Sequence, residues 1–186
     1  MWQVHRVRVA VVVVVVVVVV ACGGSTVRSG GASGMGGERA DASGVNDADV
    51  DRDIARVRAA TDAFRSIDGA AAAGYAPVVR QCIAHPEHGA MGFHHTNRAL
   101  LDDRIEVERP EILLYERTEA GEYVLNGVEY IVPYSARSRD AEPPAVMGQA
   151  LKRSDELELW YLHVWVWKEN RAGLFADWNP AVECRS

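Results

Sequence analysis

The chain has 186 residues and a formal net charge of −6, from 20 Lys and Arg against 26 Asp and Glu. This length suits one folded domain with appended segments. An acidic chain of this kind has no surplus of cations with which to follow a phosphate backbone, so the charge excludes a nucleic-acid-binding protein.

The first residues predict export. Residues 1–8 carry Arg6 and Arg8 with no acidic residue, and residues 9–21 form a run of 13 apolar residues. A permanent membrane helix needs about 20 apolar residues, so this run is too short to span a bilayer comfortably. A basic start, a short apolar stretch and small residues at its end are typical of a secretory signal, and we expect residues 1–21 to be one.

The end of this run resembles the lipobox of bacterial lipoproteins, which are cut before a cysteine that then carries diacylglycerol. The matching residues are Val19-Val20-Ala21-Cys22-Gly23, and Val19 departs from the usual leucine. The resemblance implies that Cys22 is the lipidated first residue of a membrane-anchored protein on the extracytoplasmic side. Two alternatives are an ordinary secreted protein cut nearby and a retained membrane helix. Without Arg6 and Arg8 the mature chain has 18 Lys and Arg and 26 Asp and Glu, a charge of −8, so the lipid rather than the charge would hold it at the membrane.

Residues 22–49 consist mainly of Gly, Ser, Ala and Asp and have almost no large apolar side chain. Such a segment cannot bury a core, so we expect it to be a disordered tether. A Gly-rich chain of about 25 residues has an end-to-end distance of roughly 25–30 Å. The tether would let a single domain, residues 50–186, stand off from the membrane surface.

Export also bears on the remaining cysteines. In an oxidising compartment Cys82 and Cys184 are expected to form a disulfide. The alternative is that Cys82 is a nucleophile near His85 or His88. These two histidines also have a spacing that could hold a metal ion, but Pro86 between them disfavours a helix that presents both on one face. We therefore interpret them as part of an exposed loop.

The first clear element of the domain is a helix over 50–67. Its apolar residues recur at spacings of three and four and form one stripe: Val50, Ile54, Val57, Thr61, Phe64 and Ile67. Asp49 or Asp51 can cap its start, and Gly69 suits its C-terminal end. We expect this helix to cover one face of a sheet.

The residues that follow predict a mostly antiparallel sheet. Residues 90–97 have the pattern of an extended segment. Residues 112–115 and 123–132 are typical of a hairpin, with a turn at 118–122 and a bulge or kink at Asn126-Gly127. One helix with five to seven strands makes this an α+β domain.

Residues 160–167 are expected to form a central strand. Alternation places Trp160, Leu162, Val164 and Val166 on one face and Tyr161, His163, Trp165 and Trp167 on the other. Both faces are largely apolar, which indicates a strand covered on both sides rather than an edge. A turn at 169–173 follows, and Asp177 and Asn179 are expected to bond the local backbone in a capped turn.

Several blocks of the domain resemble a family of exported bacterial proteins of unknown activity. The blocks are Gly89-Ala90-Met91-Gly92-x-His94-x-x-Asn97, Arg109-Pro110-Glu111-x-Leu113-x-Tyr115-Glu116, Gly127-Val128-Glu129-Tyr130, His163-Val164-Trp165-x-Trp167-x-x-Asn170 and Gly173-x-Phe175-x-Asp177-Trp178-Asn179-Pro180 with Cys184. The resemblance covers about residues 50–184 and implies a domain boundary and a set of marked positions, but no mechanism. The chain departs from the family in having His95, where an aromatic residue is expected, and Arg171, where proline is expected.

Three polar residues interrupt apolar, strand-like blocks: His94, Glu129 and His163. Two histidines and one carboxylate are the ligand set of many Zn and non-haem Fe sites. Such a centre would make the protein a metal-dependent hydrolase or oxygenase, with Glu129 as ligand or base. The sequence lacks the short ligand spacing of a known metal motif. If the extended segment is a strand, His94 and His95 point to opposite sides and cannot both ligate one ion without a bulge.

Two other interpretations of these residues stay open. In one, the three form a buried polar cluster in which His163 hydrogen-bonds Glu129 and His94 bonds a backbone carbonyl. In the other, a pocket for a small organic ligand is lined by Tyr161, Trp165 and Trp167. The functional hypotheses are therefore a lipid-anchored envelope protein that binds a small molecule or a protein partner through its aromatic face, a metal-dependent enzyme at the membrane surface, and a purely structural envelope module.

Overall fold

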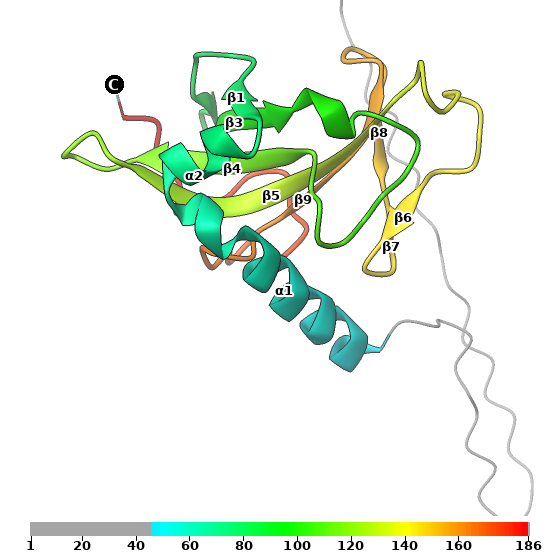
Figure 1. Ribbon diagram of the computed structural model, residues 1–186, viewed down its shortest axis with the longest axis horizontal. Coiled ribbons are helices and arrows are strands. Elements are labelled where there is room, and N and C mark those ends of the chain that lie inside the picture. Colours follow the sequence, from blue (N-terminus) through cyan, green and yellow to red (C-terminus); the bar gives the residue numbers. More distant parts are fainter. Residues whose placement is uncertain (1–45, 186) are drawn as a thin grey trace, which may run out of the picture. The chain divides into compact units, whose positions relative to one another are not determined.

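The computed structural model describes residues 46–185, which belong to one unit of helices and sheet (Figure 1). The predicted signal peptide, the lipidated Cys22 and the tether up to residue 45 lie outside the described residues. No helix among the described residues is both long enough and apolar enough to cross a membrane.

The two α-helices precede the sheet in the chain. The helical elements are α1 (Asp47–Thr61), the 3₁₀ turn η1 (Asp62–Arg65), α2 (Ile67–Ala72) and a second 3₁₀ turn, η2 (Arg98–Leu100). The strands are β1 (Tyr75–Pro77), β2 (Ile83–His85), β3 (Gly89–Asn97), β4 (Ile112–Arg117), β5 (Tyr123–Pro133), β6 (Ala145–Val146), β7 (Gln149–Ala150), β8 (Lys152–Ser154) and β9 (Leu159–Val164). The main sheet has the order β1-β3-β4-β5-β9-β8, with β2 also paired to β3, and β6 and β7 form a separate hairpin. All of these pairings are antiparallel, which confirms the α+β class with a helix packed on a mostly antiparallel sheet.

The predicted first helix starts earlier than expected and is not continuous. Its N-cap is Asn46, whose side-chain oxygen accepts a hydrogen bond from the backbone N–H of Asp49 at 2.9 Å. The prediction that Asp49 or Asp51 caps the helix was therefore wrong, and the first residues of α1 belong to the segment that was expected to be tether. The α-helix ends at Thr61, whose hydroxyl donates to the Val57 carbonyl at 2.7 Å, a bond that bends helices.

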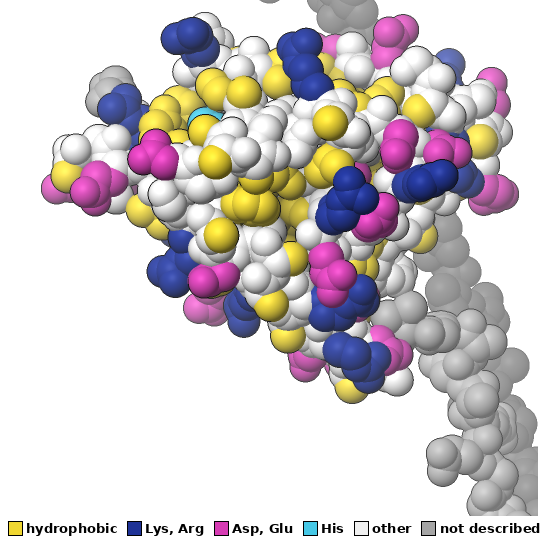
Figure 2. All heavy atoms as spheres, viewed as in Figure 1, with side chains coloured by type: hydrophobic (Ala, Val, Ile, Leu, Met, Phe, Trp, Pro, Cys, Tyr) yellow, Lys and Arg dark blue, Asp and Glu magenta, His cyan; other side chains and the backbone are white. Residues whose placement is uncertain are grey.

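The apolar stripe of the helical region packs on the sheet as expected. Val57 is fully buried, and Ile54 and Phe64 pack partly buried against the same cluster. Figure 2 shows Lys and Arg side chains interspersed with Asp and Glu on this side of the molecule, so the exposed surface here carries no extended patch of one sign.

The sheet is covered on both faces. The face against α1, here called the helix face, is made mainly by Leu113, Tyr115, Val128, Tyr130, Trp160, Leu162 and Val164. The other side, here called the opposite face, carries Ile112, Leu114, Ile131 and Trp165. The C-terminal segment, residues 165–185, covers part of the opposite face, where Trp165 and Val182 are buried and Asn179 pairs with Ala90 of β3. The prediction of a central strand covered front and back is confirmed for β9, which lies between β5 and β8.

The predicted bulge in β5 is confirmed. Leu114 pairs with Gly127 and Tyr115 with Leu125, so Asn126 is the extra residue in β5. A Cβ atom on Gly127 would lie 2.7 Å from the Val164 carbonyl oxygen, which explains why only glycine fits beside the end of β9.

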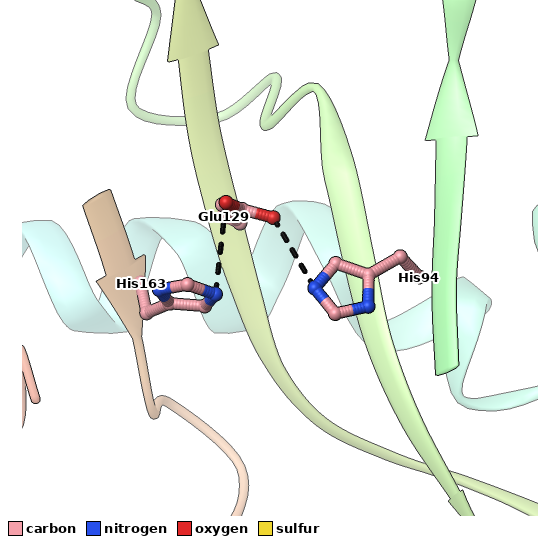
Figure 3. A group of neighbouring side chains, drawn as sticks. All are labelled: His94, Glu129 and His163. Carbon is pink, nitrogen blue, oxygen red and sulfur yellow. Dashed lines mark ion pairs between the residues drawn. The ribbon is translucent and has the colours of Figure 1, made fainter. Parts of the chain in front are cut away.

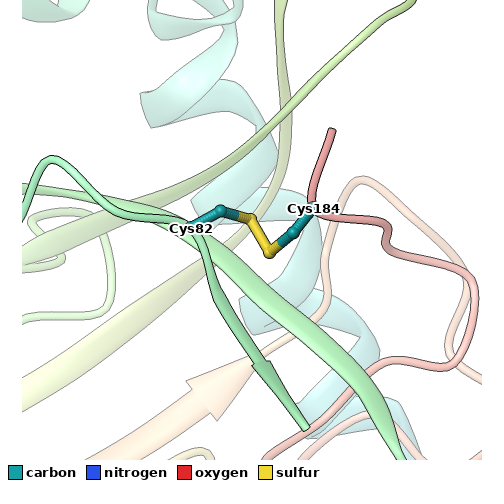
Figure 4. Close-up of a disulfide and its surroundings, with 2 residues drawn as sticks. All are labelled: Cys82 and Cys184. Atoms are coloured by element: carbon teal, nitrogen blue, oxygen red, sulfur yellow. A yellow bond between two sulfur atoms is a disulfide. The ribbon is translucent and has the colours of Figure 1, made fainter. Parts of the chain in front are cut away.

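The predicted disulfide is confirmed (Figure 4). Cys82 and Cys184 are joined with their Cα atoms 5.5 Å apart, across 102 residues of sequence. The bond ties the C-terminal segment to the strand pair β2–β3 and leaves Cys82 without the free thiolate that a nucleophile needs. A disulfide is compatible with an extracytoplasmic location.

Candidate metal centre

Three strands each place one polar side chain on the opposite face. Glu129 of β5 and His163 of β9 are direct partners in the strand pairing. His94 lies on β3, where it pairs with Leu114 of β4. Neighbouring strands lie about 4.8 Å apart, so β3 and β5 are about 10 Å apart. The long Glu129 side chain and the His94 ring close this gap by reaching toward each other over β4 (Figure 3).

The three side chains converge. Glu129 Oε2 lies 3.6 Å from His94 Nε2, and Glu129 Oε1 lies 3.6 Å from His163 Nε2 (Figure 3). One ligand atom from each residue lies within 4.8 Å of the others. Among residues 46–185 this is the one group of three or more His, Cys, Asp or Glu side chains with such spacing. The arrangement can hold a metal ion.

The separations of 3.6 Å between these nitrogen and oxygen atoms distinguish a metal site from a hydrogen-bonded cluster. They exceed the usual N–H···O range of about 2.7–3.2 Å, so the carboxylate does not hydrogen-bond either ring. Two ligands that each lie about 2.0–2.2 Å from one tetrahedral Zn²⁺ are about 3.4 Å apart, close to the observed spacing. The proposed hydrogen bond from His163 to Glu129, on which the buried-cluster interpretation depended, is therefore not formed.

His163 is the most deeply buried member of the group. Its side chain is 1% exposed, against 9% for Glu129 and 15% for His94. Neither ring nitrogen of His163 has a hydrogen-bond partner. A buried donor or acceptor left unpaired costs about 1–3 kcal/mol. A ligand that binds the ring would remove this penalty, whereas packing alone does not.

The aromatic neighbours of His163 hold its ring in place. The ring of Trp165 stacks parallel to it with centroids 6.3 Å apart and planes 10° apart, and the ring of Tyr161 approaches at 5.7 Å with its plane tilted by 76°. These three residues alternate along one strand and its extension, so their side chains share one face.

His94 is in the charge state that a metal ligand requires. Burial lowers the pKa of His94, and this effect outweighs the opposing attraction of the Glu129 carboxylate. A neutral imidazole keeps a lone pair for a cation, and metal binding depends on deprotonated ligands. His94 is also the most exposed of the three, so the cluster is open to solvent on the β3 side.

A further carboxylate approaches the other side of the His163 ring. Asp177 Oδ1 lies 3.7 Å from His163 Nδ1 and 2.5 Å from Lys152 Nζ. Partial burial on its own raises the pKa of Asp177, but the interactions with His163 and Lys152 outweigh it and lower that pKa to about 2. The prediction that Asp177 bonds the local backbone was wrong, whereas Asn179 does so, accepting from the Ala181 N–H at 2.9 Å.

The predicted aromatic pocket does not form as one surface. Trp165 is 3% exposed, and its indole N–H donates to the Ala176 carbonyl at 2.7 Å. Trp167 lies on the helix face, where its indole N–H donates to the Thr61 hydroxyl at 3.0 Å. Grouping Trp167 with Tyr161 and Trp165 was therefore wrong, because β9 ends at Val164.

The backbone explains the change of side at Trp167. The N–H groups of Trp167 and Lys168 both donate to the carbonyl of the bulged residue Asn126, at 2.9 Å each. This contact turns the chain out of the strand, so the alternation of faces stops before Trp167.

The other histidines do not join the centre. His95 points to the helix face, as predicted from its neighbour His94, and its ring lies 5.0 Å from that of Tyr115. His85 and His88 stack on each other at 4.3 Å beside Trp178. His88 is exposed in the turn after β2, as predicted, whereas half-buried His85 is the last residue of β2, so the predicted loop contains a short strand.

No protein-family description, no curated protein and no solved structure matches this chain, so the resemblance to a family of exported bacterial proteins stays a prediction and the site is interpreted from its own geometry.

Proposed function

We propose that this protein is an exported, lipid-anchored protein that binds one Zn²⁺ ion through His94, Glu129 and His163. The observation that carries the proposal is the buried His163 ring, whose two nitrogens lack hydrogen-bond partners while Nε2 faces two other ligand groups. Two imidazoles and a carboxylate form a known zinc ligand set that leaves a fourth position open.

Zinc fits the setting better than iron. The same ligand set binds Fe(II) in oxygenases, so the donor atoms alone do not separate the two metals. Zinc has no redox chemistry and keeps its charge in the oxidising compartment that the Cys82–Cys184 disulfide favours.

The chemistry that such a centre supports best is activation of water. Zinc with three protein ligands lowers the pKa of a bound water to about 7, which produces a nucleophile for hydrolysis. Glu129 directs one oxygen to each histidine, so we assign it as a ligand rather than as the general base. Tyr161, which is half-buried at the edge of the centre, is the aromatic side chain that a small ligand would meet first.

The test is the metal content of the mature protein purified without chelators. We expect about one zinc per chain, lost in His163→Ala and kept in His88→Ala, a matched control in the exposed loop. A folded wild-type protein that contains no metal and takes up none from added ZnCl₂ would contradict the proposal.

The lipid anchor is tested separately. Export of the wild-type chain should give a protein in the membrane fraction whose mass includes a diacylglycerol on Cys22. The Cys22→Ser variant should lose both the lipid mass and the membrane association, whereas an unmodified wild-type protein in the soluble fraction would exclude the anchor.

A further inference from the structure

A second carboxylate, that of Asp177, lies on the side of the His163 ring that faces away from Glu129. His163 Nε2 lies 3.6 Å from Glu129, and His163 Nδ1 lies 3.7 Å from Asp177 Oδ1. The two nitrogens of an imidazole ring point in different directions, so Asp177 cannot ligate an ion that binds Nε2. Each nitrogen of this buried ring therefore faces a carboxylate of its own.

A neutral imidazole has one N–H and one lone pair, and its partners decide which nitrogen carries the proton. An ionised carboxylate only accepts hydrogen bonds, so Asp177 favours a proton on Nδ1, whereas Glu129 favours one on Nε2. Glu129 is divided between two rings, while Lys152 holds Asp177 Oδ1 beside Nδ1, so the balance favours a proton on Nδ1. The lone pair then lies on Nε2, which faces Glu129 and His94.

We infer that Asp177 is a positioning residue that fixes the tautomer of His163 and so directs the Nε2 lone pair at the metal. The inference rests on the proposed zinc function, because it gives the bound ion its outer carboxylate. Metal-bound histidines regularly donate their second N–H to a carboxylate, which also increases the basicity of the ligand nitrogen.

Asp177 is itself held by a second residue. Lys152 of β8 donates to Asp177 Oδ1 at 2.5 Å and to the Phe175 carbonyl at 3.2 Å. These bonds join the edge of the sheet to the C-terminal segment and keep Asp177 Oδ1 on the Nδ1 side of the ring. Asp177 is therefore oriented by contacts that are independent of the metal.

If the Lys152–Asp177 ion pair only joined β8 to the C-terminal segment, it would have no effect on His163. The tautomer of His163 therefore distinguishes a structural role of Asp177 from a positioning role. In the metal-free mature protein labelled with ¹⁵N-histidine, long-range ¹H–¹⁵N correlation spectra identify the protonated nitrogen. We expect the proton on Nδ1 in the wild type. In Asp177→Asn the amide can donate to Nδ1, so the proton should move to Nε2.

Zinc affinity is the second readout, measured by competition with a chromophoric chelator. Asp177→Asn should weaken binding by about 10–100-fold, as expected for an outer-shell partner, and Asp177→Glu should recover part of the loss. Asp155→Asn is the matched control, because Asp155 is an exposed carboxylate paired with Arg139 at 2.8 Å. It should change neither the tautomer nor the affinity.

A proton on Nε2 in the metal-free wild type would overturn the inference even if Asp177→Asn failed to fold. An Asp177→Asn protein that kept both the tautomer and the affinity would overturn it as well. A wild type with the proton on Nδ1 that binds no zinc would support the tautomer role while the zinc function failed, so the two proposals fail separately.

Discussion

The two faces of the sheet differ in the hydrogen bonding of their buried tyrosine and histidine side chains. On the helix face three buried phenols each donate to a backbone carbonyl: Tyr75 to Pro110 at 2.7 Å, Tyr115 to Phe64 at 2.5 Å and Tyr130 to Val107 at 2.6 Å. On the opposite face both nitrogens of His163 lack a partner. These phenols are thus satisfied by the fold itself, whereas both nitrogens of His163 are left available for a ligand. On the helix face the buried indole N–H of Trp160 also lacks a partner, but among residues 46–185 no cluster of ligand groups is gathered beside it.

This difference indicates that the two faces have different roles. Burial raises the pKa of all three tyrosines, so the phenols stay protonated and act as hydrogen-bond donors that fasten the helices and loops to the sheet. The opposite face has a smaller apolar cluster and collects His94, Glu129 and His163 in its middle. We interpret the helix face as the source of stability and the opposite face as the binding surface.

The largest expected effect comes from the disulfide that fastens the cover of the opposite face. Replacing both Cys82 and Cys184 by serine should lower the free energy of unfolding by about 4–5 kcal/mol, because the bond closes a loop of about 100 residues. Urea unfolding of the double variant measures this loss. Cys22→Ser serves as a control and should leave the midpoint unchanged, and an unchanged midpoint in the double variant would contradict the prediction.

Substitution of two adjacent leucines of β4 allows a direct comparison of the two faces. Leu113 lies on the helix face and Leu114 on the opposite face, and both are fully buried. Leu113→Ala and Leu114→Ala should each destabilise the protein by about 2–5 kcal/mol. Only Leu114→Ala should also weaken zinc binding, because Leu114 is the strand partner of His94. Equal zinc affinities in the two variants would count against the division between the faces.

Glu111, just before β4, makes the stability depend on pH. Burial raises the pKa of Glu111 to about 8, despite a hydrogen bond to its Oε2 from the Ile131 N–H at 3.0 Å. The protonated form is therefore favoured in the folded state. Its contribution to stability is fully present below about pH 4.5, the ordinary pKa, and is lost as the pH rises to about 8.

The slope that Glu111 contributes should reach about 1.4 kcal/mol per pH unit between these limits. In Glu111→Gln this contribution should disappear, so the variant should gain stability relative to the wild type as the pH rises. Urea unfolding at a series of pH values measures the difference between the two proteins. Parallel profiles would show that Glu111 does not titrate in this range.

The smallest effects come from removing single polar groups on each face. Tyr130→Phe deletes a satisfied phenol and should lower the free energy of unfolding by about 1 kcal/mol. His163→Leu deletes an unsatisfied ring and should raise the stability of the metal-free protein by about 1 kcal/mol or more. Thermal unfolding in the presence of a chelator compares them, and a destabilised His163→Leu protein would mean that His163 serves the core.

Sequence patterns predicted the local features of the fold well. Alternation placed Trp160, Leu162 and Val164 on one side of β9 and His163 on the other, because residues in a strand point to the two faces in turn. Asn126-Gly127 predicted the bulge in β5, since glycine allows two strands to approach closely. The choice of His94, Glu129 and His163 came from polar residues placed in apolar blocks, and the structure brings these three together.

The missed features depend on contacts across the sheet. Trp167 changes side because a carbonyl about 40 positions earlier in the chain receives its N–H, and no local pattern reports such a contact. The sequence did not indicate that Asp177 and Lys152 act on His163, since a carboxylate in a turn and a lysine in a short edge strand are common at surfaces. Their role follows only once the C-terminal segment lies over β9.

The most direct measurement of the central claim is the zinc K-edge X-ray absorption spectrum of the zinc-loaded mature protein. The account predicts two imidazole nitrogens and carboxylate oxygen about 2.0–2.2 Å from the metal, with one imidazole lost in His163→Ala. A first shell of oxygen atoms alone, or one that is unchanged in His163→Ala, would contradict a metal centre on the opposite face.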